Sequence, residues 1–181
     1  WLGTSALAAH QIMCTVGQLG FMLYYGMAAA VAVKVSNYNG RCDAGNIRRS
    51  VNAGFHLILV MAVAASLLIY VVRDVMGALF TDDVEVVLLV AQLGIPFILY
   101  QFGDGLQCNF SNALRGLADV KPAMLFAFVS YFVVCLPLGY LFAFPFGLGL
   151  TGVWLSFPFG LTFAGVLFYM RFRSVLMKKE R

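Results

Sequence analysis

Charged residues are scarce in this sequence: only 11% of its 181 residues are Asp, Glu, Lys or Arg, whereas 62% are hydrophobic. Soluble globular domains carry about 25% charged residues, so the composition excludes the ordinary soluble class. Histidine occurs twice and cysteine four times, in no spacing typical of a metal or disulfide site. No nucleotide-binding loop or catalytic motif is present. We therefore predict that the chain is not an enzyme and holds no cofactor.

Long apolar runs, by contrast, are abundant. Five of them are long enough to cross a hydrocarbon layer of about 30 Å, which requires about 20 helical residues. The alternating pattern of a barrel strand is absent, so helices are the expected spanning form. We predict an all-α integral membrane protein in one module over residues 1–181. Its polytopic bundle has five transmembrane helices near residues 12–33, 53–72, 84–114, 122–144 and 148–170.

The charged residues indicate the orientation of these helices. If the five runs alternate in direction, most basic residues fall on one side, namely Lys34, Arg41, Arg48, Arg49, Arg115, Lys121, Arg171, Arg173, Lys178, Lys179 and Arg181. The other side has only Arg73 among four carboxylates. Basic loops mark the cytoplasmic side, so we expect a cytoplasmic C-terminus, an external Trp1 and a location in the cytoplasmic membrane. The net charge of +4 follows from this topology, and no nucleic-acid partner is needed.

Several local signals concern helix ends and completeness. Residues 37–40 suit a break after the first helix, and Asp119 before Pro122 suits the start of the fourth, with the aspartate as an N-terminal acceptor. Pro96 and Pro137 fall inside helices, where each could be a tolerated kink or a hinge. The chain begins at Trp1 without Met, and we expect it to be a piece of a longer membrane protein.

Asp104 is the lone carboxylate of residues 99–107, inside the third apolar run. An aspartate near the middle of a bilayer costs about 2.5–3.5 kcal/mol on insertion scales, so by default it marks an ion or substrate path. At 100° per residue it shares an arc of roughly 100° with other polar residues. They are Gln101, Cys108, Ser111, Asn112 and Arg115, with Gln107 beside the arc. This stripe must face other helices or a water-filled cavity.

The depth of Asp104 can be estimated from Arg115, which we expect at the cytoplasmic interface. Asp104 lies 11 residues earlier, which places it about 16 Å deeper at 1.5 Å per residue, near the midplane. Gly103 and Gly105 leave room there for a ligand or a neighbouring helix. A proton or a cation could neutralise the carboxylate; alternatively, hydrogen bonds between helices could hold it without any further role.

Other candidate residues carry weaker signals. Phe21, Tyr24 and Tyr25 could line a cavity and attract cations, or could be ordinary membrane aromatics. We expect His10 to be a satisfied interfacial histidine. Trp154 is expected to face lipid or to pack against other helices.

Taken together, the chain resembles the multidrug and toxic compound extrusion (MATE) transporters. The resemblance rests on residues 2–12, 21–22, 104–107, 113–116, 136–140 and 152–154, and on Asp119 with Pro122. The resemblance implies a twelve-helix antiporter made of two six-helix lobes. This chain would then form helices eight to twelve, and the N-terminal lobe and helix seven would lie outside it.

The resemblance also implies roles for particular residues. Asp104 matches the carboxylate that the family uses for cation coupling and substrate release, and Phe21 matches an aromatic position beside the cation. The candidate site comprises Asp104, Gln107, Gln101, Phe21, Tyr24 and Ser111. Its expected partners are Na⁺ or H⁺ as the coupling ion, with Na⁺ held at Asp104, small organic and often cationic substrates, and the lipid bilayer.

Two alternatives remain open from the sequence. A flippase for lipid-linked precursors would need cationic residues in its cavity to hold pyrophosphate, and the predicted spans contain none. A membrane scaffold without transport activity would use the polar stripe only to join helices.

Overall fold

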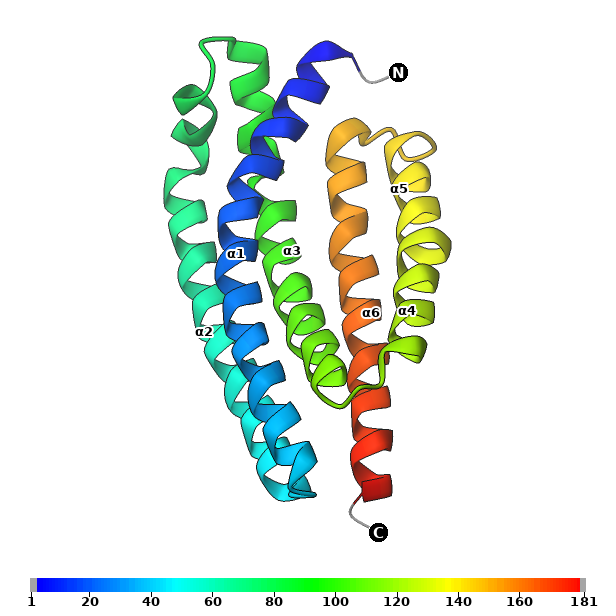
Figure 1. Ribbon diagram of the computed structural model, residues 1–181. Helices are drawn as coiled ribbons and strands as arrows, with labels where there is room; N and C mark the ends of the chain where they lie inside the picture. The colour runs from blue at the N-terminus through cyan, green and yellow to red at the C-terminus, as the bar shows by residue number, and fades with distance from the viewer. Residues whose placement is uncertain (1–2, 180–181) are drawn as a thin grey trace.

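The computed structural model describes residues 3–179, so Trp1, Leu2, Glu180 and Arg181 lie outside the described residues. The chain forms a bundle of long helices (Figure 1). They are α1 (Thr4–Gly40), α2 (Ala44–Met76), the 3₁₀ turn η1 (Gly77–Leu79), α3 (Val84–Gly116), α4 (Val120–Phe128), the π-helical segment η2 (Val129–Cys135), α5 (Leu136–Ala143) and α6 (Gly149–Lys179). Within residues 3–179, five helical stretches are long and apolar enough to cross a membrane, as predicted. The first, second and fifth extend well beyond the predicted runs at both ends or at one end, whereas the third and fourth match their predicted bounds within two residues.

Helix α3 is the centre of the bundle and packs against α1, α2 and α6 (Figure 1). Glycines permit this close packing on two sides of Asp104. A β-carbon at Gly105 would lie 2.8 Å from Ile58 of α2, and one at Gly103 would lie 3.1 Å from Leu161 of α6. The room that Gly103 and Gly105 leave beside Asp104 is therefore occupied by the neighbouring helices α2 and α6.

The fourth membrane stretch changes its winding before Pro137. Over η2 the backbone is π-helical, and the Leu136 N–H donates to the Tyr131 carbonyl, five residues earlier. Proline has no N–H and its ring clashes with the carbonyl four residues before it, so a local widening relieves the helix. Pro96, in contrast, lies within an uninterrupted α3.

The end of α1 and the start of α4 differ in detail from the predicted helix boundaries. Helix α1 runs through residues 37–40 and ends at Gly40, before Cys42 with its positive φ of 55°. Helix α4 does begin after Asp119, but the Asp119 carboxylate does not cap it, so that expectation was wrong. Its oxygens instead accept from Arg171 of α6, at 2.6 Å from Nε and 3.0 Å from Nη2. A guanidinium offers two charge-assisted hydrogen bonds, which are stronger than one bond from a backbone N–H.

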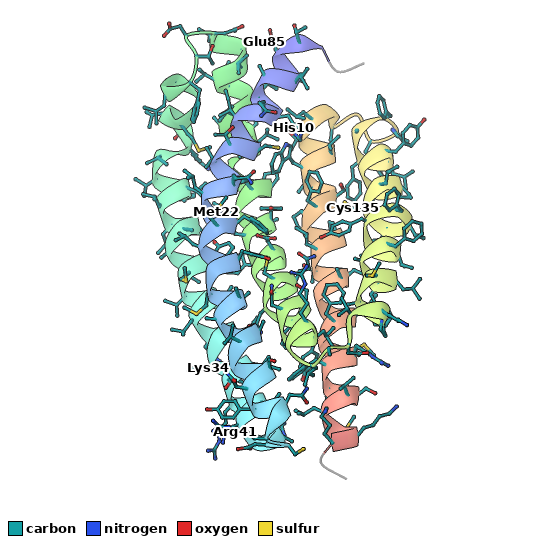
Figure 2. All side chains as sticks on the ribbon, in the orientation of Figure 1. His10, Met22, Lys34, Arg41, Glu85 and Cys135 are labelled. Carbon is teal, nitrogen blue, oxygen red and sulfur yellow. The ribbon has the colours of Figure 1, made fainter. Side chains whose placement is uncertain are left out.

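The connections rich in basic residues lie at one end of the bundle. Lys34 and Arg41 lie near the α1–α2 junction, at the same end as the C-terminal part of α6, whereas His10 and Glu85 lie at the opposite end (Figure 2). The α3–α4 connection also turns toward the basic end (Figure 1). The fold thus agrees with the alternation of helix direction that the sequence predicted.

Candidate functional site

Asp104 lies in the middle of α3 and is only 3% exposed. Gln101, one turn earlier, is 2% exposed and packs against α1 where Gly20 leaves space; a β-carbon there would lie 3.2 Å from the Gln101 Oε1 atom. Tyr24, one turn further along α1, is fully buried. The structure therefore brings three of the predicted site residues to the interface between α1 and α3, away from the lipid-facing surface.

The hydrogen bonding of Asp104 is incomplete. Its Oδ1 atom accepts a long bond of 3.8 Å from the Cys108 thiol, one turn along the same helix. Its Oδ2 atom is buried and has no donor among residues 3–179. The ion pairs in this part of the chain are Arg73–Asp74 and Arg171–Asp119, so neither neutralises Asp104.

Two more buried oxygens at this interface lack a hydrogen-bond partner among the described residues. They are the Tyr24 hydroxyl and the Gln101 Oε1 atom. Oxygen atoms are the ligands that hard cations prefer. No group of three or more His, Cys, Asp or Glu occurs within residues 3–179 in an arrangement that could hold a metal ion. A cation here would therefore be held by one carboxylate together with neutral oxygens.

Three tyrosines from three different elements lie near enough to Asp104 to interact with its charge. Asp104 interacts electrostatically with Tyr24 of α1, Tyr100 of α3 and Tyr131 of η2. The Tyr131 hydroxyl also accepts a hydrogen bond of 2.7 Å from Gln107 Nε2. The π-helical segment thus contributes a polar group to the surroundings of the buried carboxylate.

The other predicted site residues, Gln107, Ser111 and Phe21, have their described contacts with groups other than the Asp104 carboxylate. Gln107 faces η2 through its bond to Tyr131. The Ser111 hydroxyl donates to the Cys108 carbonyl of its own helix at 3.2 Å. Phe21 stacks on Tyr25 with a ring-centroid distance of 5.6 Å. Of these three predicted residues, Phe21 lines a cavity.

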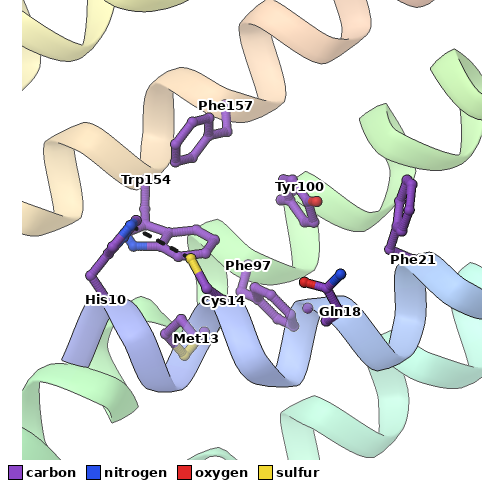
Figure 3. A pocket seen from close by; sticks show the side chains of 10 residues that line it. His10, Met13, Cys14, Gln18, Phe21, Phe97, Tyr100, Trp154 and Phe157 are labelled. Atoms are coloured by element: carbon purple, nitrogen blue, oxygen red, sulfur yellow. Dashed lines mark hydrogen bonds between the residues drawn. The ribbon is translucent and has the colours of Figure 1, made fainter. Parts of the chain in front are cut away.

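That cavity has a volume of about 340 Å³ and lies between α1, α3 and α6 (Figure 3). Its lining comprises His10, Met13, Cys14, Gly17, Gln18, Phe21, Phe97, Tyr100, Trp154 and Phe157. Asp104 is not among these residues, but Tyr100 precedes it by one helical turn. Tyr100 is thus the lining residue of α3 that is nearest in sequence to Asp104.

Sequence reasoning missed several residues of this region. Tyr100 could have been found, because a spacing of four residues places it on the same helix face as Asp104. Tyr131 gave no such signal, since it comes from another membrane stretch. Trp154 proved to be a packing residue that is 3% exposed. His10 was expected to have all its hydrogen bonds satisfied, but its Nδ1 atom is buried without a partner in the described part of the chain.

Comparison with known sequences shows a consistent likeness. A family model described as MatE matches residues 1–141. The chain is 38% identical over 173 residues to the "Probable multidrug resistance protein NorM" of Xylella fastidiosa strain 9a5c, covering 96% of this chain and 37% of the relative. It is 39% identical over 174 residues to the protein of the same name from Xanthomonas axonopodis pv. citri strain 306, covering 96% and 38%. The chain thus spans less than two fifths of these relatives' length.

Solved structures show the same fold. The crystal structure of the eukaryotic MATE transporter AtDTX14 has a TM-score of 0.86 at 21% identity, covering 98% of this chain and 40% of that one. The structure titled "Crystal structure of MATE in the straight conformation" has a TM-score of 0.85 at 18% identity, with the same coverage. With its five apolar helices, the chain is a multi-pass helical membrane protein.

Proposed function

Because this chain belongs to the MatE family, the multidrug and toxic compound extrusion transporters, we propose that it is part of a cation-coupled antiporter exporting organic, often cationic, compounds. In this proposal it supplies helices eight to twelve of a twelve-helix transporter. The N-terminal lobe and helix seven come from the rest of the protein. The relatives' names, which describe multidrug resistance proteins, support the substrate class.

The observation that carries the proposal is the buried Asp104 carboxylate with an oxygen that has no donor within residues 3–179. Burying an unpaired charge is costly, so a buried carboxylate is normally paired, protonated or bound to a cation. The nearby unpaired oxygens of Tyr24 and Gln101 support a cation as the partner. A proton on Asp104 would remove the same charge, and either ion serves the mechanism.

Exchange at this carboxylate couples the ion to the substrate. Asp104 carries one negative charge, so an entering Na⁺ or H⁺ competes with a cationic substrate for it. Each unit charge that moves inward through 100 mV releases about 2.3 kcal/mol, which is sufficient to bias a transport step. Neutralising Asp104 also changes its interaction with the Tyr131 hydroxyl, which links α3 to the π-helical segment.

The proposed orientation places the basic end of the bundle in the cytoplasm. The α1–α2 junction with Lys34 and Arg41, the α3–α4 connection and the C-terminal end of α6 lie at this end (Figure 2). Basic residues favour the cytoplasmic side of a bilayer. The protein then resides in the cytoplasmic membrane with its C-terminus inside the cell.

The two alternatives find less support. A flippase for lipid pyrophosphates needs cationic groups in its cavity, and the cavity between α1, α3 and α6 has no Lys or Arg in its lining. A scaffold would use the polar stripe to join helices, as Asn109 does by donating to the Val51 carbonyl of α2 at 3.3 Å. The hydrogen bond of Asp104 is instead to its own helix.

The test is Asp104→Asn in the full-length protein, with export of a fluorescent organic cation measured in cells and in proteoliposomes under an imposed Na⁺ or H⁺ gradient. We expect gradient-driven export to be lost while the amount of protein in the membrane stays unchanged. Asp82→Asn, which alters an exposed carboxylate in the α2–α3 connection, is the matched control and should transport normally. Normal gradient-driven export by Asp104→Asn would refute the coupling role.

A further inference from the structure

Within residues 3–179, one face of α2 has no helix packed against it, at the edge of the bundle (Figure 1). Val60, Leu67 and Val71 on this face are 66%, 64% and 77% exposed. At 100° per residue these three side chains fall within an arc of about 40°. Ile58 and Ile69, on the opposite side of the helix, are buried. We call the exposed side the open face of α2. A large apolar face of this kind marks contact with lipid or with another protein.

Arg49 lies at one end of the open face. It precedes Val60 by 11 residues, or about 20° around the helix axis, so its exposed side chain is in line with the apolar residues. His56 lies between these two residues and is also exposed. Its Nδ1 atom donates to the Asn52 carbonyl oxygen of the same helix at 2.7 Å. The open face therefore changes along its length from charged to polar to apolar.

Positive charge is in excess around Arg49. Residues 34–56 contain four basic side chains, all of them exposed: Lys34, Arg41, Arg48 and Arg49. Asp43 is the one carboxylate in this stretch of the sequence. Both of its oxygens accept from Asn46, and it attracts Arg41 and Arg49 without forming an ion pair with either in the structure of residues 3–179. This end of α2 is therefore complementary in charge to an anion.

Helix α1 brings a further cation to the same level. A β-carbon at Gly54 of α2 would collide with Val31 of α1, so these two residues face each other. The two helices run in opposite directions (Figure 1). Lys34, three residues after Val31, consequently lies within about 3 Å of the level of Arg49 along the axis. The positive charge at this level thus comes from both helices.

The spacing along the open face matches one leaflet of a bilayer. Arg49 and Val60 lie about 16 Å apart along the helix at 1.5 Å per residue. A leaflet is about 20 Å thick with its headgroup region. Val60 therefore lies beside the acyl chains of a lipid whose phosphate is at the level of Arg49. Leu67 lies about 10 Å further along the helix, beside the opposite leaflet.

We propose that the open face of α2 binds an anionic phospholipid, whose phosphate accepts from Arg49 and whose acyl chain lies along Val60. A guanidinium can donate two parallel hydrogen bonds to a phosphate, which makes arginine well suited to this contact. The excess of basic residues around Arg49 favours a lipid with a net negative charge over a zwitterionic one. This site goes beyond the proposed function, since it uses neither Asp104 nor the cavity between α1, α3 and α6.

A tryptophan placed on the open face tests the proposal. The full-length protein with Val60→Trp is reconstituted with brominated phosphatidylglycerol or with brominated phosphatidylcholine of the same chains. Bromine quenches tryptophan fluorescence on contact, and the difference from the unsubstituted protein isolates the new residue. We expect phosphatidylglycerol to bind beside this residue at least about fivefold more strongly, the effect of one basic residue near an anionic lipid.

Two outcomes of this measurement would overturn the proposal. Equal binding of the two lipids would mean that the open face contacts lipid without preference for charge. Absence of quenching by either lipid would mean that another part of the protein or a second copy covers the face. Leu57→Trp, at a residue of the same leaflet that is 50% exposed, serves as the reporter if Val60→Trp does not fold.

Substitution of Arg49 tests the phosphate contact. Arg49→Gln, combined with Val60→Trp, should reduce the preference for phosphatidylglycerol about fivefold. Arg173→Gln is the matched control, because it removes an exposed arginine of α6 at the same end of the bundle. It should leave the preference unchanged. An undiminished preference in the Arg49→Gln protein would contradict the assignment.

Leu67→Trp measures whether the preference is confined to one leaflet. This residue lies on the same open face but beside the opposite leaflet, so phosphatidylglycerol and phosphatidylcholine should bind there about equally. Arg49→Gln should not alter that ratio. An equal preference for phosphatidylglycerol at Val60→Trp and Leu67→Trp would refute a site at Arg49, since it would show a general attraction of the whole protein for anionic lipid.

Discussion

Gln107 of α3 donates a hydrogen bond of 2.7 Å to the hydroxyl of Tyr131 in the π-helical segment. The bond joins two membrane stretches next to the buried Asp104, with which Tyr131 also interacts electrostatically. Tyr131 belongs to the segment whose winding departs from the α-helix. Such π-helical turns are frequent at functional sites.

Removing this bond should weaken the packing of η2 against α3. Tyr131→Phe deletes the hydroxyl and leaves the Gln107 amide without its partner, so we expect the free energy of unfolding to fall by about 1 kcal/mol. Thermal unfolding of the purified protein measures the change. Tyr140→Phe, at a residue that is 56% exposed on α5, is the control and should have little effect. A double-mutant cycle with Gln107→Leu should give a coupling energy of similar size, and additive effects would contradict the prediction.

The Asp119–Arg171 ion pair predicts a dependence of stability on pH. The Arg171 guanidinium lowers the pKa of Asp119 below its usual range through two hydrogen bonds. A lowered folded-state pKa contributes stability above the unfolded-state pKa of about 3.9, and that contribution is lost as the pH falls through the folded-state value. The pair is partly exposed, so its contribution should be at most about 1 kcal/mol. Comparing unfolding of wild type and Asp119→Asn at neutral and acidic pH should show a difference that shrinks in acid, and a constant difference would exclude the ion pair as its cause.

A side chain at Gly105 should destabilise the protein. A β-carbon there would lie 2.8 Å from Ile58 of the neighbouring helix, so Gly105→Ala should destabilise the protein by about 1–3 kcal/mol through overpacking. Gly26 is the matched control, because nothing lies within 4 Å of an added β-carbon and it also sits within a helix. Gly26→Ala should be neutral or stabilising, by up to about 1 kcal/mol. Equal effects of the two substitutions in thermal unfolding would disprove the close-packing argument.

Cys42 reports the orientation of the bundle. It is exposed and follows α1 at the basic end, which we place in the cytoplasm. A membrane-impermeant maleimide should label it in inside-out vesicles and leave it unlabelled in intact cells. Cys42→Ser, in which the remaining cysteines stay in place, gives the background. Labelling of Cys42 from outside intact cells would invert the proposed topology.

Much of the fold could be predicted because its signals are local. The length of each apolar run and the recurrence of polar residues every three to four positions on α3 depend only on neighbouring residues. The first correctly predicted five helices long enough to span a membrane, and the second a buried face containing Gln101 and Asp104. The N-terminal acceptor role of Asp119 was wrong because its partner, Arg171, is 52 residues away in the sequence. A local sequence pattern cannot show that Asp119 accepts hydrogen bonds from this distant guanidinium instead of from a backbone N–H of α4.

The sequence by itself determined that the chain crosses a membrane, how many times it does so, and that one carboxylate must be shielded from lipid. Hydrophobicity and helical period fix these properties without reference to the rest of the fold. Only the tertiary structure decided which groups surround Asp104 and that an aromatic cavity forms beside it. Tyr24 and Tyr131 lie near Asp104, and the ring of His10 contacts that of Trp154, because packing around α3 brings together residues far apart in the chain. Such contacts depend on side-chain shape and helix crossing, which a linear pattern does not encode.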